Sequence, residues 1–300
     1  MKFFLFTLVF FALTFHLYAD AFLAEDRIYY SADSYKIDYE NEIIYANGHA
    51  SFRKEDKEVY ADRIVIYYAK GQKWAQLFNN VVVLNEIDNN RISGDYGEVL
   101  YNEDIYTVKG NTVYTDEEIE ITSDAVSTYK GEESMFSGDV RYIDSNYEIT
   151  APVLSIVNDI ATFKKESEAL HLESGDMIYC DTISINTNTG DAVFLERVLY
   201  VQEEEEGEDA LLIRSDTVRY FQESNTYIFL GNVFVLNKDF SVQSTVARYM
   251  SDAGILKASG DIVLQEDEKY TYCNNANYDE NTEKTVLYNK VNGILFNTRN

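Results

Sequence analysis

Six aspartates recur along the chain at a nearly regular spacing, and each follows a small residue. They are Asp33, Asp62, Asp95, Asp124, Asp181 and Asp216. If the fold gathered these carboxylates, they could bind a cation or supply the acid and base of a polysaccharide lyase or hydrolase. Their even distribution, about one in every 29 residues, favours a structural role in which each aspartate occupies the same bend of a repeated unit.

The other reactive residue types are scattered. Outside the first 21 residues the only histidines are His49 and His171, and neither belongs to a metal-binding or phosphate-binding motif. Cys180 and Cys273 occupy the same position of two repeats that lie three units apart, which exceeds the reach of a disulfide if the units stack in order. We therefore predict no catalytic residue, no metal and no cofactor, and two buried free thiols.

The repeat itself is the strongest signal in the chain. Its landmark small residues are Ala32, Ala61, Gly94, Ser123, Ala151, Cys180, Ser215, Ser244 and Cys273. A second landmark follows about 16 residues later and is often glycine followed by Asn or Asp, as at Gly110-Asn111 and Gly231-Asn232. Self-similarity of this kind indicates a stack in which each unit buries its apolar face against its neighbours. Function is then expected in an extended surface or groove.

Alternation within one repeat predicts β-strands. Val59 and Ala61 share one parity, whereas Ile64 and Ile66 share the other. Because side chains alternate between the faces of a strand, this change predicts a bulge or bend at Asp62, whose carboxylate could accept hydrogen bonds from freed backbone amides. We expect two or three short strands per repeat, and a glycine that lets the strand turn or lets the opposite wall approach.

Composition narrows the function. The 300 residues contain 52 Asp and Glu against 25 Lys and Arg, a net charge of −27, which disfavours nucleic acid as a partner. The abundance of Tyr and Phe, with a single proline, suits strands. An acidic run, Glu203 to Asp209, is expected to be a solvated loop inserted at a turn, with a cation site as the alternative.

The N-terminus predicts export. Lys2 precedes an apolar stretch from Phe3 to Phe15, so residues 1–21 are expected to form a cleaved signal peptide, with a retained membrane anchor as the alternative. Repeats 1–4 would then occupy residues 22–150 and repeats 5–9 residues 151–300. Pro152 replaces the aspartate of the fifth repeat, and because proline cannot donate to a strand ladder, the two arrays are either continuous or jointed there.

Three stretches carry a resemblance to a known family. They are Val59-Tyr-Ala-Asp-Arg-Ile-Val-Ile-Tyr-Tyr68, Ile92-Ser-Gly-Asp-Tyr-Gly-Glu-Val-Leu-Tyr101 and Tyr227-Ile-Phe-Leu-Gly-Asn-Val-Phe-Val235. With their recurrence over residues 28–296, the chain resembles the OstA-like family of periplasmic proteins that carry lipopolysaccharide between two membranes, the Lpt bridge. The resemblance implies an all-β fold, an elongated, open and twisted β-jellyroll of about nine repeats, which encloses an apolar groove. The chain differs from the family in being longer than the single-domain bridge protein, in lacking an outer-membrane barrel and in its acidity.

On this basis we predict a periplasmic carrier that shields the acyl chains of an envelope lipid or of lipopolysaccharide and is not an enzyme. The expected groove residues are Ile64, Ile66, Val81, Val83, Val99, Val113, Val140, Leu154, Ile156, Ile183, Val218, Val233, Val235, Ile262 and Leu264. Alternatively these side chains pack on one another and leave no groove, as in an exported structural or adhesive solenoid; a polysaccharide-active enzyme is the third hypothesis.

The predicted partners follow from the open ends of such a jellyroll. Unpaired strand edges at its first and last units are templates for another strand. We expect head-to-tail self-association, or association with other jellyroll transport proteins, through residues 28–52 and 270–296.

Overall fold

The computed structural model describes residues 28–54, 57–69, 73–87, 89–101, 103–129, 133–202, 211–238, 240–266 and 269–295. The predicted signal peptide, residues 1–21, and the acidic run from Glu203 to Asp209 lie outside these ranges. The chain divides into two compact units between Glu117 and Glu118. The described residues form twenty strands and three short 3₁₀ helices, with no α-helix, which confirms the predicted all-β class. None of the described helices could cross a membrane.

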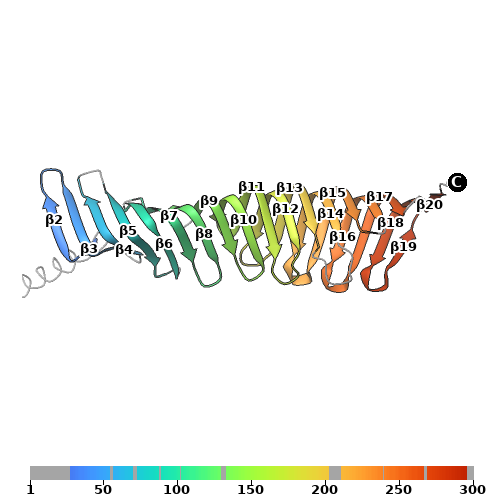
Figure 1. Ribbon diagram of the computed structural model, residues 1–300, viewed down its shortest axis with the longest axis horizontal. Helices are drawn as coiled ribbons and strands as arrows, with labels where there is room; N and C mark the ends of the chain where they lie inside the picture. The colour runs from blue at the N-terminus through green and yellow to red at the C-terminus, as the bar shows by residue number, and fades with distance from the viewer. Residues whose placement is uncertain are drawn as a thin grey trace, which may run out of the picture. The chain divides into compact units, whose positions relative to one another are not determined.

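Unit 1 is an antiparallel meander. Its strands are β1 (Tyr29–Ser31), β2 (Ser34–Asp38), β3 (Ile43–Lys54), β4 (Lys57–Tyr67), β5 (Trp74–Asn85), β6 (Asn90–Leu100) and β7 (Ile105–Thr115). From β3 to β7 each strand pairs with the next in chain order, whereas β1 and β2 both pair with β3. In Figure 1 these strands follow one another side by side.

Unit 2 continues the same pattern with more strands. They are β8 (Glu120–Tyr129), β9 (Glu133–Ile143), β10 (Tyr147–Val157), β11 (Ile160–His171), β12 (Met177–Asn186), β13 (Ala192–Val201), β14 (Leu212–Phe221), β15 (Thr226–Leu236), β16 (Ser241–Met250), β17 (Ile255–Glu266), β18 (Lys269–Asp279), β19 (Lys284–Tyr288) and β20 (Asn292–Leu295). Each strand from β8 to β18 pairs antiparallel with its successor, and both β19 and β20 pair with β18.

Every long strand bends near its middle. Between β4 and β5, for example, Tyr60 pairs with Val82 and the next pair is Arg63 with Phe78. Buried residues alternate on both sides of the shift, so each strand contributes to two walls. We call the wall that contains Lys57–Ala61 wall A and the wall that contains Ile64–Tyr67 wall B; their outer margins, where strands connect, are rim A and rim B. The same division applies to each repeat in unit 2.

The two walls pack inner face to inner face. Tyr142 of wall A and Phe163 of wall B have ring centroids 5.2 Å apart, and a Cβ added at Gly97 in wall B would approach Val81 of wall A to 3.2 Å. Each unit is thus a folded sheet with a corner and a mouth, an open β-jellyroll as predicted. The strands of 10 to 12 residues run through the bend, whereas the sequence predicted shorter segments, because the ladder resumes beyond each shift.

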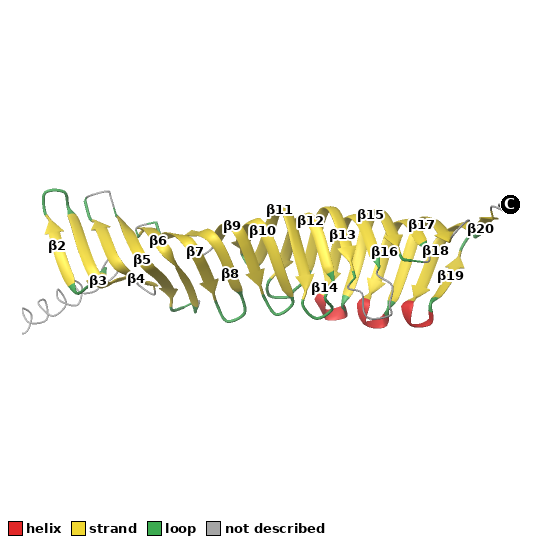
Figure 2. Ribbon diagram, viewed as in Figure 1, coloured by secondary structure: helices red, strands yellow, loops and turns green. Residues whose placement is uncertain are grey.

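Three 3₁₀ helices mark rim B of unit 2. They are η1 (Gln222–Ser224), η2 (Ser251–Ala253) and η3 (Glu280–Thr282), and all lie at the same end of their strands (Figure 2). Each is followed by a residue in the left-handed conformation, Asn225, Gly254 or Glu283. The repetition of one turn geometry keeps the successive strands in register at this rim.

Left-handed residues make the corner. Gly48-His49, Gly110-Asn111 and Gly231-Asn232 have positive φ at both positions, in strands β3, β7 and β15. The glycine is needed because a Cβ at Gly231 would overlap the carboxylate of Asp216 on the neighbouring strand. The glycine therefore turns the strand, as predicted, and the group that approaches it is the aspartate and not the opposite wall.

Replacing this glycine should destabilise unit 2. Gly231 has a φ of +76°, so Gly231→Ala adds left-handed strain and a clash with Asp216, at a cost of about 1–3 kcal/mol. The matched control is Gly293→Ala, whose added Cβ would meet nothing closer than 3.9 Å. Thermal melts should show a clear fall in Tm for the first variant only; equal melts would contradict this account of the corner.

Pro152 lies in a strand that is paired on both sides. Its strand β10 pairs with β9 and with β11 on both sides of the bend, and the register shift of both ladders falls next to Pro152. The missing N–H is tolerated because the ladder is already interrupted at the corner. The ladders of β10 are thus continuous apart from the shift at the corner. The two compact units meet between residues 117 and 118, and the predicted grouping of repeats into residues 22–150 and 151–300 stays a prediction.

Candidate functional site

The fifteen predicted groove residues lie on both walls, and all but Val113 face inward; Val113 pairs with Ser93 on the outer face, because the inward positions of this segment are Thr112 and Tyr114, the partner of the buried Ile92. Eight of them belong to wall A and seven to wall B, and thirteen have at most 6% of their surface exposed; Val113 and Ile156 are half-buried. In unit 1 they include Ile64 and Val81, which have no exposed surface. A side chain without accessible surface has no space beside it for a ligand atom. Occupation of this interior by an acyl chain therefore requires the walls to separate, and the lipid-binding role of these residues stays a prediction.

Large aromatic side chains fill the interior of unit 2, and none of them is among the predicted groove residues. The nine aromatic residues among the largest fully buried side chains are Tyr142, Tyr147, Tyr200, Tyr227, Tyr249, Phe136, Phe163, Phe194 and Phe229, and all lie in this unit. Their inward parity was visible in the sequence at Tyr227 and Phe229. The interior of unit 1 is built mostly from Ala, Val, Ile and Leu. The two units thus differ in the side chains that fill the space between their walls, which are aromatic in unit 2 and mostly aliphatic in unit 1.

The mouth of unit 2 is closed by rings from opposite rims. Tyr147, His171 and Tyr200 come from rim A, whereas Tyr220, Tyr227 and Tyr249 come from rim B. The Tyr220 hydroxyl and His171 Nε2 are 3.3 Å apart, and the Tyr200 and Tyr227 rings have centroids separated by 5.2 Å. Burial of these rings stabilises the closed mouth by their apolar area and by edge-to-face contacts.

A buried carboxylate anchors this aromatic seal. Asp176 is 2% exposed, and its Oδ2 accepts hydrogen bonds from the Tyr200 hydroxyl at 2.8 Å and the Ser174 hydroxyl at 2.7 Å. Ser174 also lies 3.0 Å from His171 Nδ1. Burial lowers the pKa of His171 and raises the pKa of Tyr200. The serine sits between the histidine and the aspartate, so the aspartate does not orient the imidazole as in a nucleophilic triad.

The hydroxyls of the seal should differ in their contribution to stability. Tyr200→Phe removes a donor from the buried Asp176 carboxylate, and we expect a loss of about 1.5–3 kcal/mol in the free energy of unfolding. Tyr147 and Tyr227 have buried hydroxyls that no hydrogen bond of good geometry satisfies. The double variant Tyr147→Phe, Tyr227→Phe should therefore be neutral or stabilising in denaturant titration. A larger loss in the double variant than in Tyr200→Phe would contradict this assignment.

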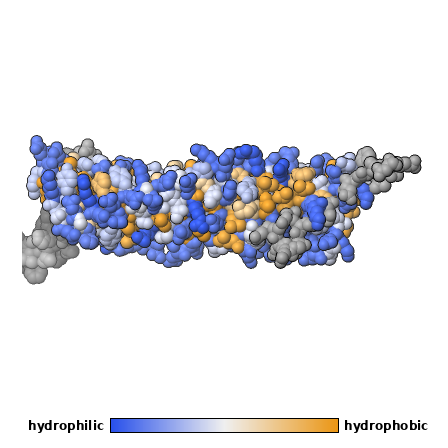
Figure 3. Space-filling model, viewed as in Figure 1, coloured by the Kyte–Doolittle hydropathy of each residue, from blue (hydrophilic) through white to orange (hydrophobic). Residues whose placement is uncertain are grey.

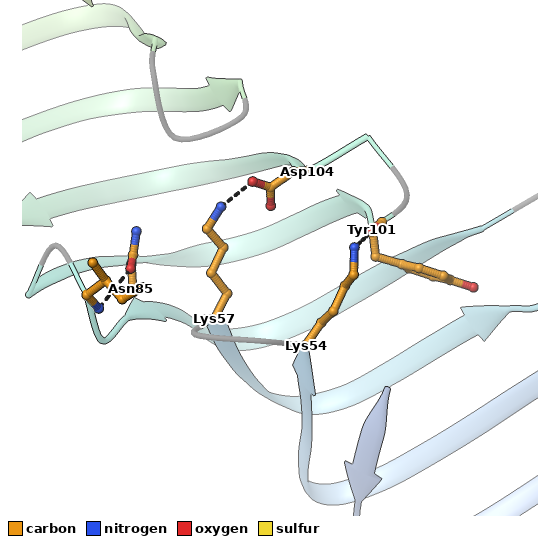
Figure 4. Close-up of polar contacts among 6 residues, drawn as sticks. Lys54, Lys57, Asn85, Tyr101 and Asp104 are labelled. Atoms are coloured by element: carbon orange, nitrogen blue, oxygen red, sulfur yellow. Dashed lines mark hydrogen bonds and ion pairs between the residues drawn. The ribbon is translucent and has the colours of Figure 1, made fainter. Parts of the chain in front are cut away.

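Lysines close the mouth of unit 1 (Figure 4). Lys57 on rim A forms an ion pair with Asp104 on rim B, and Lys54 donates to the Tyr101 carbonyl at 2.8 Å. The Tyr101 side chain is buried, and its hydroxyl donates to the Tyr67 carbonyl at 2.8 Å. On rim A, the Asn85 side chain accepts a hydrogen bond from the Ile87 amide at 3.1 Å. The contacts of Lys54 and Lys57 across this mouth are thus polar.

The six aspartates mark the corner, one in each of six repeats. Asn80 donates to Asp62 at 3.0 Å, and Asn111 and Asn232 donate to Asp95 and Asp216 at 2.9 Å. His49 contacts Asp33, Arg197 forms an ion pair with Asp181, and Asp124 lies against Gly138. Five of the six carboxylates thus contact a side chain of the neighbouring strand, and Asp124 lies against the corner glycine; the predicted hydrogen bonds from backbone amides stay a prediction. The described residues contain no group of three or more potential metal ligands.

Electrostatics at the corner are local. A hydrogen bond from Arg197 lowers the pKa of Asp181, and the hydrogen bond to Asp33 raises the pKa of His49.

Cys180 and Cys273 are free and buried, as predicted, and each thiol donates to a backbone carbonyl at 3.3 Å. Burial raises the pKa of Cys180 to about 12, so this thiol is not a nucleophile at neutral pH.

The outer surface is less uniformly polar than the alternation predicts. On the face shown in Figure 3, unit 1 is mostly hydrophilic, whereas hydrophobic side chains gather over unit 2. Exposed apolar side chains of unit 2 include Leu172, Tyr179, Phe221 and Leu236. The outer faces of the walls therefore carry exposed apolar side chains as well as carboxylates.

Comparisons with known proteins add two solved structures. One is the crystal structure of LptH, the LptA homologous periplasmic component of the conserved lipopolysaccharide transport device from Pseudomonas aeruginosa; identity is 12%, 70% of this chain and 99% of that chain are covered, and the TM-score is 0.20. The other is apo AztD from Citrobacter koseri, with 9% identity, coverage of 87% and 88%, and a TM-score of 0.16. No family profile and no curated protein matches the chain. At these TM-scores neither likeness bears on function, which is argued from the chain itself.

Proposed function

We propose that this chain is a periplasmic lipid carrier whose walls separate to shield acyl chains, with lipopolysaccharide as the candidate cargo. The observation that carries the proposal is the continuous apolar lining of both walls within each unit, below a mouth that in unit 1 is bridged by polar contacts of Lys54 and Lys57. An acyl chain of about twelve carbons gains on the order of 10 kcal/mol when covered. The motifs that resemble the OstA-like family support the same function. Shielding needs no catalyst, and we propose no enzymatic activity.

The test is lipid co-purification. Protein isolated from its native envelope should yield a stoichiometric lipid in an organic extract analysed by mass spectrometry, and the lipid identifies the cargo. A matched preparation of Ile64→Glu, which places a charge on the inner face of unit 1, should carry less lipid. Protein that is folded and lipid-free in both preparations would overturn the proposal.

The filled interior of unit 2 favours a second function, an exported structural solenoid. Nine large aromatic side chains occupy that interior with at most 2% of their surface exposed, as a dry core requires. On this reading unit 2 stiffens or extends the molecule and the extract contains no specific lipid. Wild-type protein that releases one defined lipid would exclude it for the chain as a whole.

The terminal strands are the proposed contacts with other jellyrolls. Among the described pairings β1 and β2 pair only with β3, and β19 and β20 only with β18, so each carries a strand edge that could accept a further strand. Tyr29, Tyr30, Tyr35 and Ile37 are exposed near the first edge.

A photo-crosslinker placed at Tyr35 should capture a second copy, or another jellyroll protein, in a reaction that depends on concentration. The same group at Tyr60, on the outside of β4, should capture little. Equal capture at both positions, or none at either, would contradict association through the edges.

A further inference from the structure

The outer face of wall B in unit 2 carries basic residues and no acidic residue over adjacent strands from β12 to β17. The chain as a whole has a net charge of −27, yet the segments of these strands in wall B contain no Asp or Glu. Every residue of these segments and of the rim B turns between them is described. The segments are residues 182–186, 192–195, 217–221, 226–230, 246–250 and 255–259.

Three exposed cations form a row across this face. Arg219 pairs with Ile228, Ile228 with Arg248, and Arg248 with Lys257. At a strand spacing of about 4.8 Å the row spans about 14 Å. We call Arg219, Arg248 and Lys257 the basic row.

The basic row is free of ion pairs within the described part of the chain. In unit 2 the described ion pairs belong to Arg141, on wall A, and to Arg197, at the corner. The same face of unit 1 differs, because it includes Glu98, and its Arg63 lies over the Phe78 ring at 4.9 Å. The three charges of the basic row are thus available to an outside partner.

Apolar side chains surround the basic row. Ile228 stands within it, and Leu230 pairs with Val246 on the side nearer the corner. On the side nearer rim B, Phe221 ends β14 and is 38% exposed, and Met250 ends β16. Because Arg and Lys carry their charge at the tip of an apolar stem, the charges can extend beyond this apolar layer.

The pairing of these strands limits what the face can bind. Each strand from β12 to β17 pairs with a neighbour on both sides, so none has an open edge that could add a strand from another protein. A partner can therefore contact only side chains, over an extended face. A membrane that contains anionic lipids fits, because its phosphates lie outside an apolar layer and its lipids diffuse to match fixed cations. A folded acidic protein would need carboxylates already placed to match the row.

We propose that unit 2 docks on membrane surfaces that contain anionic lipids, through the outer face of wall B and with the basic row on lipid phosphates. Carboxylates border this face, Asp216 and Asp261 at the corner and Glu223 and Asp252 in the rim B turns. The contact is therefore limited to the middle of the wall and is sensitive to salt. The inner faces take no part in it, so the inference does not depend on lipid carriage.

The experiment measures binding to vesicles. Protein purified from its native envelope is floated with vesicles of phosphatidylcholine alone, or of phosphatidylcholine mixed with phosphatidylglycerol. Each basic residue near an anionic surface strengthens binding about fivefold, so at low salt the mixed vesicles should bind at least about tenfold more tightly than the neutral ones. High salt should remove the difference. Equal binding to both kinds of vesicle at low salt would overturn the proposal.

The basic-row variant, Arg219→Gln with Arg248→Gln and Lys257→Gln, locates the contact. It should keep the wild-type Tm, because all three side chains are exposed, and it should bind the mixed vesicles at least about tenfold more weakly than the wild type does. Soluble polyglutamate tests an acidic protein as the alternative partner. Polyglutamate that binds the wild type as tightly as the mixed vesicles do would identify that partner and overturn the proposal.

Matched controls separate this contact from net charge and from lipid carriage. Arg214→Gln with Lys238→Gln and Lys269→Gln makes the same change in net charge at exposed positions of wall A and rim A and should leave vesicle binding unchanged. Losses equal to those of the basic-row variant would overturn the proposal. Ile64→Glu, which tests lipid carriage, should bind vesicles like the wild type. A chain that carries no lipid but docks through the basic row would therefore overturn the proposed function alone.

Discussion

Unit 2 should unfold cooperatively as the pH rises above about 10, with its buried tyrosines ionising together. Burial raises the pKa of Tyr147, Tyr200, Tyr220, Tyr227 and Tyr249, and that of Tyr220 reaches about 12. An unfolded tyrosine loses its proton near pH 10. Between that pH and the folded-state pKa the folded protein binds more protons than the unfolded chain, so stability falls as pH rises.

The expected size of this effect is large. Each such tyrosine contributes a loss of about 1.4 kcal/mol per pH unit above 10, so five of them remove about 7 kcal/mol by pH 11, which is comparable to the whole stability of a typical domain. Absorbance of tyrosinate at 295 nm and the far-ultraviolet circular dichroism of the strands should change in one transition. Tyr147→Phe with Tyr227→Phe should move its midpoint to higher pH. Tyrosinate that appears gradually, while the strand signal persists, would show that the rings are accessible to solvent.

Much of the fold could be predicted from local pattern. The parity change at Asp62 predicts a bend, because alternation within a strand is a property of adjacent residues, and the ladder between β4 and β5 shifts there. At Pro152 the sequence left two alternatives open, arrays that are continuous or jointed. A proline is incompatible with an uninterrupted ladder, but the corner already interrupts it, so Pro152 is accommodated where both ladders of β10 shift register.

Whether each mouth is open or closed could not be predicted from local pattern. Alternation fixes which side chains point inward but says nothing of the distance between the walls, so an open groove and a packed core share one pattern. The contacts that close each mouth join residues far apart in sequence: Lys57 and Asp104 are 47 positions apart, and His171 and Tyr220 are 49 apart. No local pattern connects such pairs. The role of Lys54 and Lys57 at the mouth was therefore not predicted, although the two residues flank the connection between β3 and β4.

Truncating an interior ring of unit 2 tests whether that unit is a core or a conduit. Phe229 has no exposed surface and lies between Tyr200, at a centroid distance of 5.7 Å, and Tyr227, at 6.3 Å. If these rings are permanently packed, Phe229→Ala should reduce the free energy of unfolding by about 3–5 kcal/mol and leave an apolar cavity. Phe221→Ala, at a ring that is 38% exposed, should cost less than about 1 kcal/mol.

The cavity gives a second readout that stability alone does not provide. An apolar cavity stays dry and accepts small hydrocarbons, so benzene should raise the Tm of Phe229→Ala and leave the wild type unchanged. A conduit behaves differently: walls that separate readily already expose Phe229 to ligand, so truncation costs little and benzene stabilises both proteins alike. The first outcome would make unit 2 a rigid support and restrict acyl chains to unit 1, where aliphatic side chains and two lysine contacts leave a mouth that can open.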